Sequence, residues 1–265
     1  MILSDIAAVP LSEIASLPRS VWMAVAAVLG LVFGSFITAL SYRVPRGQSI
    51  AHGRSQCPAC GTTLTARDLI PVFSWLIARG RCRVCQTAIS IRYPLIELLT
   101  AAVFMSAVWR EPRLLPLLLL LATAVLMMTL AITDLEHRRL PFPLLVPLAV
   151  LGTVYGVLIQ PQLLAAAVTA ASVVLAGLSV AALSRRFLGR PLIGAGDVYV
   201  LAIGALMLPW LAFVIFMGLA GLLALIFGLA WRRWNPDALF PFGPSVFAAL
   251  WVTMVFQAPL TGFVS

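Results

Sequence analysis

The sequence predicts an all-α polytopic membrane protein of about eight transmembrane helices, with a small zinc-binding cytoplasmic domain between the first and second helix. Three observations support this prediction. The chain is 62% hydrophobic and only 10% charged, whereas soluble domains are about 25% charged. Apolar runs long enough to cross a bilayer recur along the chain. All four cysteines lie in one arginine-rich stretch between the first two runs.

Each predicted span is an apolar run near the length of about 20 residues that a membrane crossing needs. The run from Val198 to Trp231 has 34 residues, or about 51 Å as a helix, which is too long for one crossing. Pro209 interrupts this run, so we expect two short spans there. The predicted spans are 21–41, 93–109, 114–133, 141–159, 163–183, 198–208, 210–230 and 244–262.

The arginines predict the orientation of the spans. With the N-terminus outside, 15 of the 18 arginines fall in the loops 42–92, 134–140, 184–197 and 231–243. Basic residues collect in cytoplasmic loops, so we expect these four loops to be cytoplasmic. The net charge of +9 then reflects topology in a lipid bilayer, and we expect no nucleic-acid partner.

The cysteines form two C-x-x-C pairs, Cys57 with Cys60 and Cys82 with Cys85. Two such pairs at this separation are typical of a four-thiolate zinc site. Two disulfides are disfavoured in a loop that faces the reducing cytoplasm; free thiols or another metal are the remaining alternatives. Four thiolates leave no open position on zinc, so we expect a structural site that folds the loop.

Three carboxylates lie in or against predicted spans, where an ionisable group costs about 2.5–3.5 kcal/mol and therefore indicates function. They are Glu97, Asp134 and Asp197, the last preceded by Gly194 and Gly196. Two crossings separate Asp134 from Asp197, so both lie on the same face of the membrane. Two close carboxylates do not both ionise easily, so one can act as a general acid while the other activates water. The glycines allow a peptide backbone to approach closely.

Each carboxylate also has a structural alternative. Asp197 can act only as a helix cap. Asp134 lies at the C-terminal end of its predicted span, where the helix dipole disfavours a carboxylate, so capping does not explain it. The alternative ion pairs join Asp134 with Arg138 or Arg139, and Glu97 with Arg92.

Two other functions are open to such a chain. A proton-coupled transporter would use Asp134 and Asp197 as relay groups, and would carry acidic groups near the midplane and repeated halves. Here the acidic groups lie at cytoplasmic span ends and no internal repeat is visible. A catalytically inactive zinc scaffold would lack one of the two aspartates, and both are present.

A series of segments, read in order, resembles the type IV prepilin peptidases, the bifunctional leader peptidase/N-methyltransferases. The Gly-x-Gly-Asp motif alone is a weak signal, but in this order and with the tetracysteine loop the set is specific. The resemblance covers nearly the whole chain. Its segments are Phe33–Phe36, Tyr42–Pro45, the two cysteine pairs, Ile70–Leu76, Arg79–Cys82, Arg92–Leu98, Asp134–His137, Leu140–Pro141, Gly194–Asp197 and Pro241–Pro244.

The resemblance implies a function and a set of site residues. Asp134 and Asp197 map onto the two catalytic aspartates of that family. The implied substrates are type IV prepilins or pseudopilins, cleaved after a glycine on the cytoplasmic side of the bacterial inner membrane. The new N-terminal residue is then methylated with S-adenosylmethionine, an activity that goes with the zinc loop. The implied domains are 1–41 (tail and first helix), 42–92 (zinc domain) and 93–265 (aspartic peptidase core).

Two positions depart from the family pattern. Many members carry lysine where this chain has Tyr199, and aspartate where it has Phe142. Both departures remove polar groups near the expected aspartate pair. The arginine-rich loop would repel a basic leader, so we expect the leader to bind near acidic residues such as Glu136 and Asp68. No glycine-rich nucleotide loop is visible in 42–92, so the S-adenosylmethionine site is not assigned.

Overall fold

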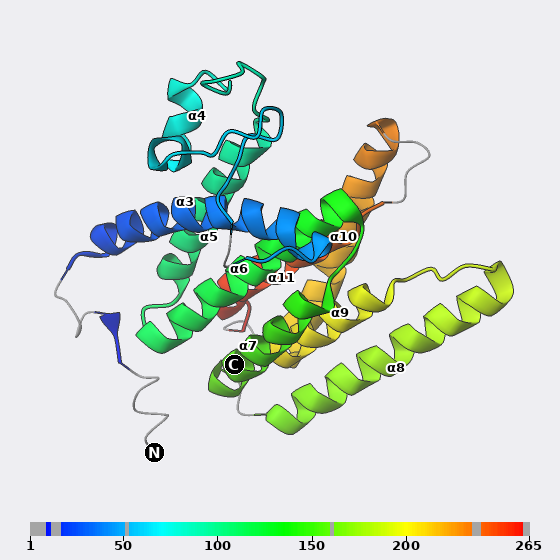
Figure 1. Cartoon of the computed structure of the whole chain (residues 1–265). Coiled ribbons are helices and arrows are strands. Elements are labelled where there is room, and N and C mark those ends of the chain that lie inside the picture. The colour runs from blue at the N-terminus through cyan, green and yellow to red at the C-terminus, as the bar shows by residue number, and fades with distance from the viewer. Residues whose placement is uncertain (1–8, 12–16, 51–52, 160–161, 235–239, 262–265) are drawn as a thin grey trace. The chain divides into compact units, whose positions relative to one another are not determined.

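The computed structural model describes residues 9–11, 17–50, 53–159, 162–234 and 240–261. The described chain is mostly helical, with three isolated β-bridges, and Figure 1 shows the course of the helices. Its described residues divide into two compact units, one within 9–117 and the other within 118–261. The helices are α3 (Arg19–Arg43), η1 (Val44–Arg46), η2 (Ala66–Leu69), α4 (Phe73–Ile77), α5 (Arg92–Arg110), α6 (Leu114–His137), α7 (Phe142–Ile159), α8 (Leu163–Leu188), α9 (Ala195–Met207), α10 (Trp210–Trp234) and α11 (Gly243–Thr261).

In the N-terminal unit, α3 and α5 pack closely along their lengths. Two glycines one turn apart make this possible. A Cβ built on Gly30 would lie 2.5 Å from the Cα of Ala101, and one on Gly34 would lie 2.5 Å from the Cα of Glu97. Small residues four apart let two membrane helices bring their backbones together. The loop between α3 and α5 carries η1, η2, α4 and the four cysteines.

In the C-terminal unit, α9 is the central helix. It packs against α7, α8, α10 and α11, and most of its side chains are buried. Glycines again permit close approach, because a Cβ on Gly177 of α8 would lie 2.7 Å from the Val198 side chain of α9. The residues that follow Asp197 are therefore held on several sides.

The structure has a helix over each of the eight predicted spans. The predicted division at Pro209 is confirmed, since α9 ends at Met207 and α10 begins at Trp210. Four helices in the described ranges are long and apolar enough to cross a membrane: α3 with η1, α6, α8 and α10. Helices α7, α9 and α11 are apolar but shorter. Eight crossings therefore remain a prediction.

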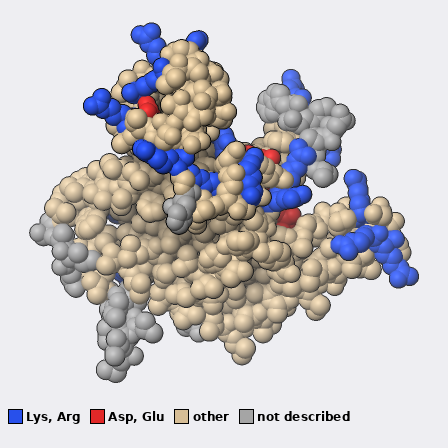
Figure 2. All heavy atoms as spheres, in the orientation of Figure 1, with Lys and Arg blue, Asp and Glu red and all other residues tan. Residues whose placement is uncertain are grey.

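The helix surfaces are those of a membrane protein. On α8, Leu164 is 80% exposed and Phe187 is 76% exposed, and a row of such side chains is stable when lipid covers it. Arginines gather instead on the loop between α3 and α5 and at the C-terminal end of α8 (Figure 2). This division between apolar helix faces and basic loops fits a multi-pass protein in a bilayer.

Candidate active site and metal centre

Asp134 lies near the C-terminal end of α6, with its side chain buried. Its Oδ2 accepts a hydrogen bond of 2.8 Å from the backbone amide of Gly243, the first residue of α11. The amides at the start of a helix have no partner within the helix and carry a partial positive charge. The start of α11 therefore compensates for the unfavourable position of Asp134 at the end of α6. This contact supplies the carboxylate with a partner other than Arg138 or Arg139, the alternative partners considered from the sequence.

The contact of Gly243 with Asp134 is one that we did not predict from the sequence. A Cβ at this position would lie 2.7 Å from Oδ2 of Asp134 and 3.1 Å from Cγ. Contacts this short force the Asp134 carboxylate to shift, so a glycine is what allows the amide to reach the carboxylate in its present position. The sequence signal was present in Pro241–Pro244, which carries the family resemblance but which we had given no role.

Asp197 lies in the first turn of α9, three residues after Gly194, which occupies the N-cap position. The backbone amide of Gly194 hydrogen-bonds to the Asp197 carboxylate. This is the backward bond of a capping box, so the capping role that we considered from the sequence is present. A Cβ on Gly194 would lie 2.9 Å from Oδ2 of Asp197, so this glycine is also in direct contact with a carboxylate.

Asp134 and Asp197 both lie in the C-terminal unit, and Asp134 is near enough for its charge to act on the Asp197 carboxylate. Each carboxylate also accepts a hydrogen bond from a glycine amide at the start of a helix. Such a pair can hold one proton between two acids and can present one acid and one base to a water molecule.

The segment that joins α6 to α7 lies against the start of α9. A Cβ on Gly196 would lie 3.0 Å from the Leu140 side chain. Two residues after Leu140 and three after Gly196, the rings of Phe142 and Tyr199 contact each other with centroids 5.9 Å apart. The two positions that depart from the family pattern are therefore in contact, and an apolar aromatic pair lies two residues from Asp197.

The remaining predicted acidic residues differ in their surroundings. Glu97 is buried in α5 of the N-terminal unit and accepts a 2.7 Å hydrogen bond from the amide of Val72. The Arg92 guanidinium, expected to pair with it, donates to Ser41 Oγ at 3.2 Å. Glu136 is exposed, two residues after Asp134.

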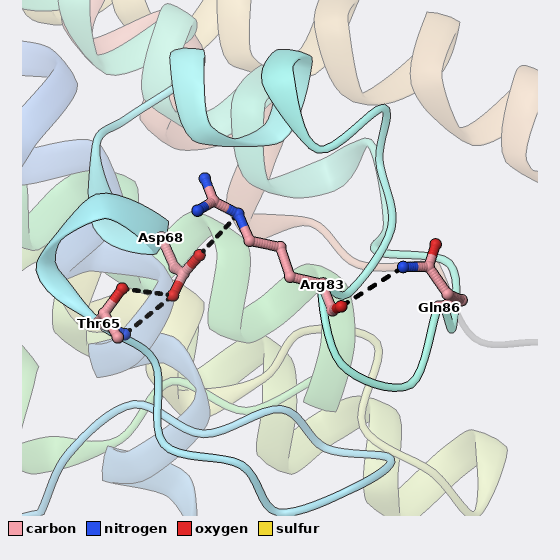
Figure 3. A network of polar contacts seen from close by, with 4 residues as sticks. All are labelled: Thr65, Asp68, Arg83 and Gln86. Atoms are coloured by element: carbon pink, nitrogen blue, oxygen red, sulfur yellow. Dashed lines mark hydrogen bonds and ion pairs between the residues drawn. The ribbon is translucent and has the colours of Figure 1, made fainter.

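Asp68 connects the two halves of the cysteine loop (Figure 3). Its carboxylate accepts hydrogen bonds from the amide and hydroxyl of Thr65, at 3.0 and 2.7 Å, and forms a 3.1 Å ion pair with Arg83. The bonds from Thr65, and then the charge of Arg83, lower the pKa of Asp68 below its ordinary value. Its contacts are those of a structural residue, and a role in leader binding stays a prediction.

The four cysteines form a metal-binding cluster. All four Sγ atoms lie within 4.8 Å of one another, and the Sγ atoms of Cys57 and Cys85 are 3.8 Å apart. A tetrahedron with Zn–S bonds of about 2.3 Å has S···S edges of about 3.8 Å. All four cysteines are free thiols, so the alternative of two disulfides is not what the structure contains. The donor set therefore fits a tetrahedral thiolate metal site.

The two C-x-x-C pairs form equivalent turns. The amide of Cys57 donates to the carbonyl of Thr62, and that of Cys82 to the carbonyl of Thr87, both at 2.9 Å. Side-chain and backbone hydrogen bonds from Thr87 lower the pKa of the Cys85 thiol to about 6, which favours the thiolate that a metal requires. A metal at this site would be held by all four thiolates and would stabilise the loop.

Comparisons with known proteins agree with the division of the chain into an N-terminal and a C-terminal unit. Residues 28–111 match the Bacterial Peptidase A24 N-terminal domain, and residues 119–229 match the Type IV leader peptidase family. The prepilin leader peptidase/N-methyltransferase of Dichelobacter nodosus is 31% identical, over 94% of this chain and 96% of that relative. No solved structure matches the chain significantly.

Two further relatives carry the same name. The protein of Aeromonas salmonicida (strain A449) is 36% identical over 78% of this chain and 73% of the relative. That of Myxococcus xanthus (strain DK1622) is also 36% identical, over 70% of this chain and 56% of the relative. Together with the helices and the cysteine cluster, these matches define a membrane-embedded protease. The chain belongs to the type IV leader peptidase family.

Proposed function

We propose that this protein is an aspartic endopeptidase that removes the leader of type IV prepilins or pseudopilins on the cytoplasmic side of the bacterial inner membrane. It also methylates the new N-terminal residue with S-adenosylmethionine. The observation that supports the peptidase mechanism best is that the charge of Asp134 acts on Asp197, while each carboxylate accepts a hydrogen bond from a glycine amide. The names of the relatives support both the substrate and the second activity.

In the proposed mechanism, one carboxylate accepts a proton from a water molecule as the water oxygen attacks the scissile carbonyl. The other carboxyl group donates its proton to the carbonyl oxygen, which gives a neutral tetrahedral diol. Collapse of the diol breaks the C–N bond: the carboxyl group that took the water proton gives it to the leaving amine, and the other carboxylate accepts a proton from a diol hydroxyl. No metal is required for this hydrolysis.

The hydrogen bond from the Gly243 amide makes the two oxygens of Asp134 inequivalent. A backbone N–H can only donate, so Oδ2 must be the acceptor. A shared proton is then carried by Oδ1, or Oδ1 contacts the water. The aromatic pair Phe142–Tyr199 gives the same region an apolar wall, suited to a substrate with an apolar residue at the cleavage point.

The topology in this proposal has eight crossings, an outside N-terminus and a cytoplasmic cysteine loop, with zinc as the metal. The arginine distribution supports it. The alternative of a proton-coupled transporter has no support from the comparisons.

The test compares Asp134→Asn, Asp197→Asn and wild type in detergent with a synthetic prepilin. The same samples are assayed for S-adenosylmethionine-dependent methylation of a pilin that has already lost its leader. We expect both variants to lose cleavage and keep methylation. Normal cleavage by either variant would refute the shared-proton mechanism.

A further inference from the structure

The N-terminal unit contains a pocket that has no role in the proposed proteolysis. Its volume is about 210 Å³. One wall is a face of α3, and the other is formed by the loop that follows it. Ligand sites for drug-sized molecules begin at about 300 Å³, so this pocket can hold one end of a longer ligand. Its lining residues are Ser35, Phe36, Ala39, Leu40 and Arg43 from α3 and Ile50, Gly53, Ser55 and Leu69 from the loop.

A cation lies at one end of this wall. Arg43 is eight residues after Ser35 on α3, about 12 Å further along the axis. One Nη2–H of its guanidinium donates to the carbonyl of Gly53 at 3.0 Å. A guanidinium has five N–H donors and binds carboxylates in a forked geometry, so Arg43 can hold the loop and also bind a carboxylate in the pocket.

An anion lies behind the other end. Ser35 lines the pocket and also interacts with the carboxylate of Glu97. Glu97 is only 6% exposed. Within the described part of the chain, no arginine or histidine forms an ion pair with it. A buried carboxylate is strongly stabilised by a nearby positive charge, so this end suits a cationic ligand.

The position of Glu97 is fixed from two sides. Its Cα is packed against Gly34 of α3, where even a methyl group has no room. Its carboxylate accepts the amide proton of Val72, which has φ +60° and ψ −53°. A β-branched residue adopts a positive φ only where its surroundings enforce it. The negative charge is therefore held rigidly beside the pocket.

We propose that this pocket binds the amino-acid end of S-adenosylmethionine. This ligand has a carboxylate for Arg43 and, four bonds from the carboxylate carbon, a sulfonium cation that the Ser35–Glu97 end would attract. The adenosine part would extend out of the pocket, in keeping with its volume. The inference rests on the methyltransferase half of the proposed function and adds the site to it. Glu97 acts here through Ser35 and is a positioning residue.

The reaction served by this site is a methyl transfer. The lone pair of the free N-terminal amine attacks the methyl carbon, and the carbon–sulfur bond breaks. Its electron pair remains on sulfur, which yields neutral thioether S-adenosylhomocysteine. Before the attack, the N-terminal ammonium group of the pilin loses one proton to the solvent and becomes the free amine. The sulfonium charge is lost in the methyl transfer, so a nearby anion favours binding of the reactant over the product.

The experiment measures binding to the full-length protein in detergent by equilibrium dialysis, with radiolabelled S-adenosylmethionine and S-adenosylhomocysteine. The variant Ala39→Leu adds bulk inside the pocket, and Ala24→Leu adds the same bulk on an exposed face of α3. We expect Ala39→Leu to weaken S-adenosylmethionine binding at least tenfold and Ala24→Leu to have no effect. Equal binding by the two variants would overturn the proposal.

A second variant tests whether the negative charge of Glu97 favours the sulfonium ligand. Glu97→Gln keeps the size of the side chain, and we expect it to reduce the preference for S-adenosylmethionine over S-adenosylhomocysteine about tenfold. Equal weakening of both ligands would show a merely structural role and overturn the assignment of Glu97. Prepilin cleavage by the same samples is expected to continue. If wild type cleaves prepilin but binds no S-adenosylmethionine, this inference fails while the peptidase stands; if wild type does not cleave, the proposed peptidase fails.

Discussion

The substitution Gly243→Ala tests the geometry around Asp134 without changing any ionisable group. The added Cβ would lie 2.7 Å from Oδ2, 3.0 Å from Cβ and 3.1 Å from Cγ of Asp134. Ordinary van der Waals contacts begin near 3.4 Å, so the carboxylate must move by several tenths of an ångström. The 2.8 Å hydrogen bond from the Gly243 amide is then lengthened or lost.

The expected effect on catalysis follows from this displacement. A hydrogen bond to a charged group contributes about 1.5–3 kcal/mol, which corresponds to about a ten- to 150-fold change in rate. A displacement of about 1 Å at a reacting group costs on the order of a hundredfold. We therefore expect kcat for prepilin cleavage to fall about ten- to 150-fold, with a smaller change in KM.

The assay measures the cleavage kinetics of a synthetic prepilin, together with the thermal unfolding of the same preparation. The matched control is Gly221→Ala in α10, where an added Cβ meets nothing within 4 Å; it should cleave at the wild-type rate. The thermal unfolding curve reports whether the Gly243→Ala protein remains folded. A folded Gly243→Ala enzyme with the wild-type kcat would refute the proposed role of the Asp134–Gly243 contact in catalysis.

Three further predictions concern the N-terminal unit. Cys57→Ser removes one of four thiolates, so purified protein should lose its equivalent of bound zinc by elemental analysis and its cysteine loop should become protease-sensitive; retained zinc would exclude a four-thiolate site. Gly30→Leu places a side chain where the Ala101 backbone lies 2.5 Å away, so the melting temperature should fall by several degrees, and an unchanged value would contradict the α3–α5 packing. The pKa of Asp68 is lowered by folding, so its stabilising contribution is present above the unfolded pKa of about 3.9 and is lost as the pH falls through the lower folded value. The melting-temperature difference between wild type and Asp68→Asn should therefore be constant above about pH 5 and shrink below pH 4; a difference that does not change with pH would show that neither the Thr65 hydrogen bonds nor the ion pair with Arg83 stabilises the ionised carboxylate.

The helices were predictable because each has a long local signal. Apolar runs about one membrane thickness long mark the helices, and Pro209 marks the break between α9 and α10. The cysteine cluster was equally predictable, because two C-x-x-C pairs within one loop bring four thiols together whatever the rest of the fold does.

The contacts around the carboxylates were not predictable in the same way. The Asp134–Gly243 hydrogen bond joins residues 109 positions apart, and no local pattern in the sequence indicates which helix begins beside the end of α6. The positive φ of Val72 could not be predicted either, because its amide is bound by Glu97, 25 residues away. Sequence reasoning identified the acidic residues and missed the backbone groups that hold them.

These backbone donors explain why asparagine is the informative substitution at Asp134. The amide oxygen of an asparagine can still accept the Gly243 N–H, so the side chain keeps its place in the packed site. The NH₂ group then occupies the position of Oδ1, the oxygen that in the proposed mechanism carries the proton or receives it from water. An NH₂ group donates but does not accept a proton at neutral pH. The variant therefore preserves the geometry and removes only the proton exchange, so its loss of cleavage would identify the chemistry and not the fold.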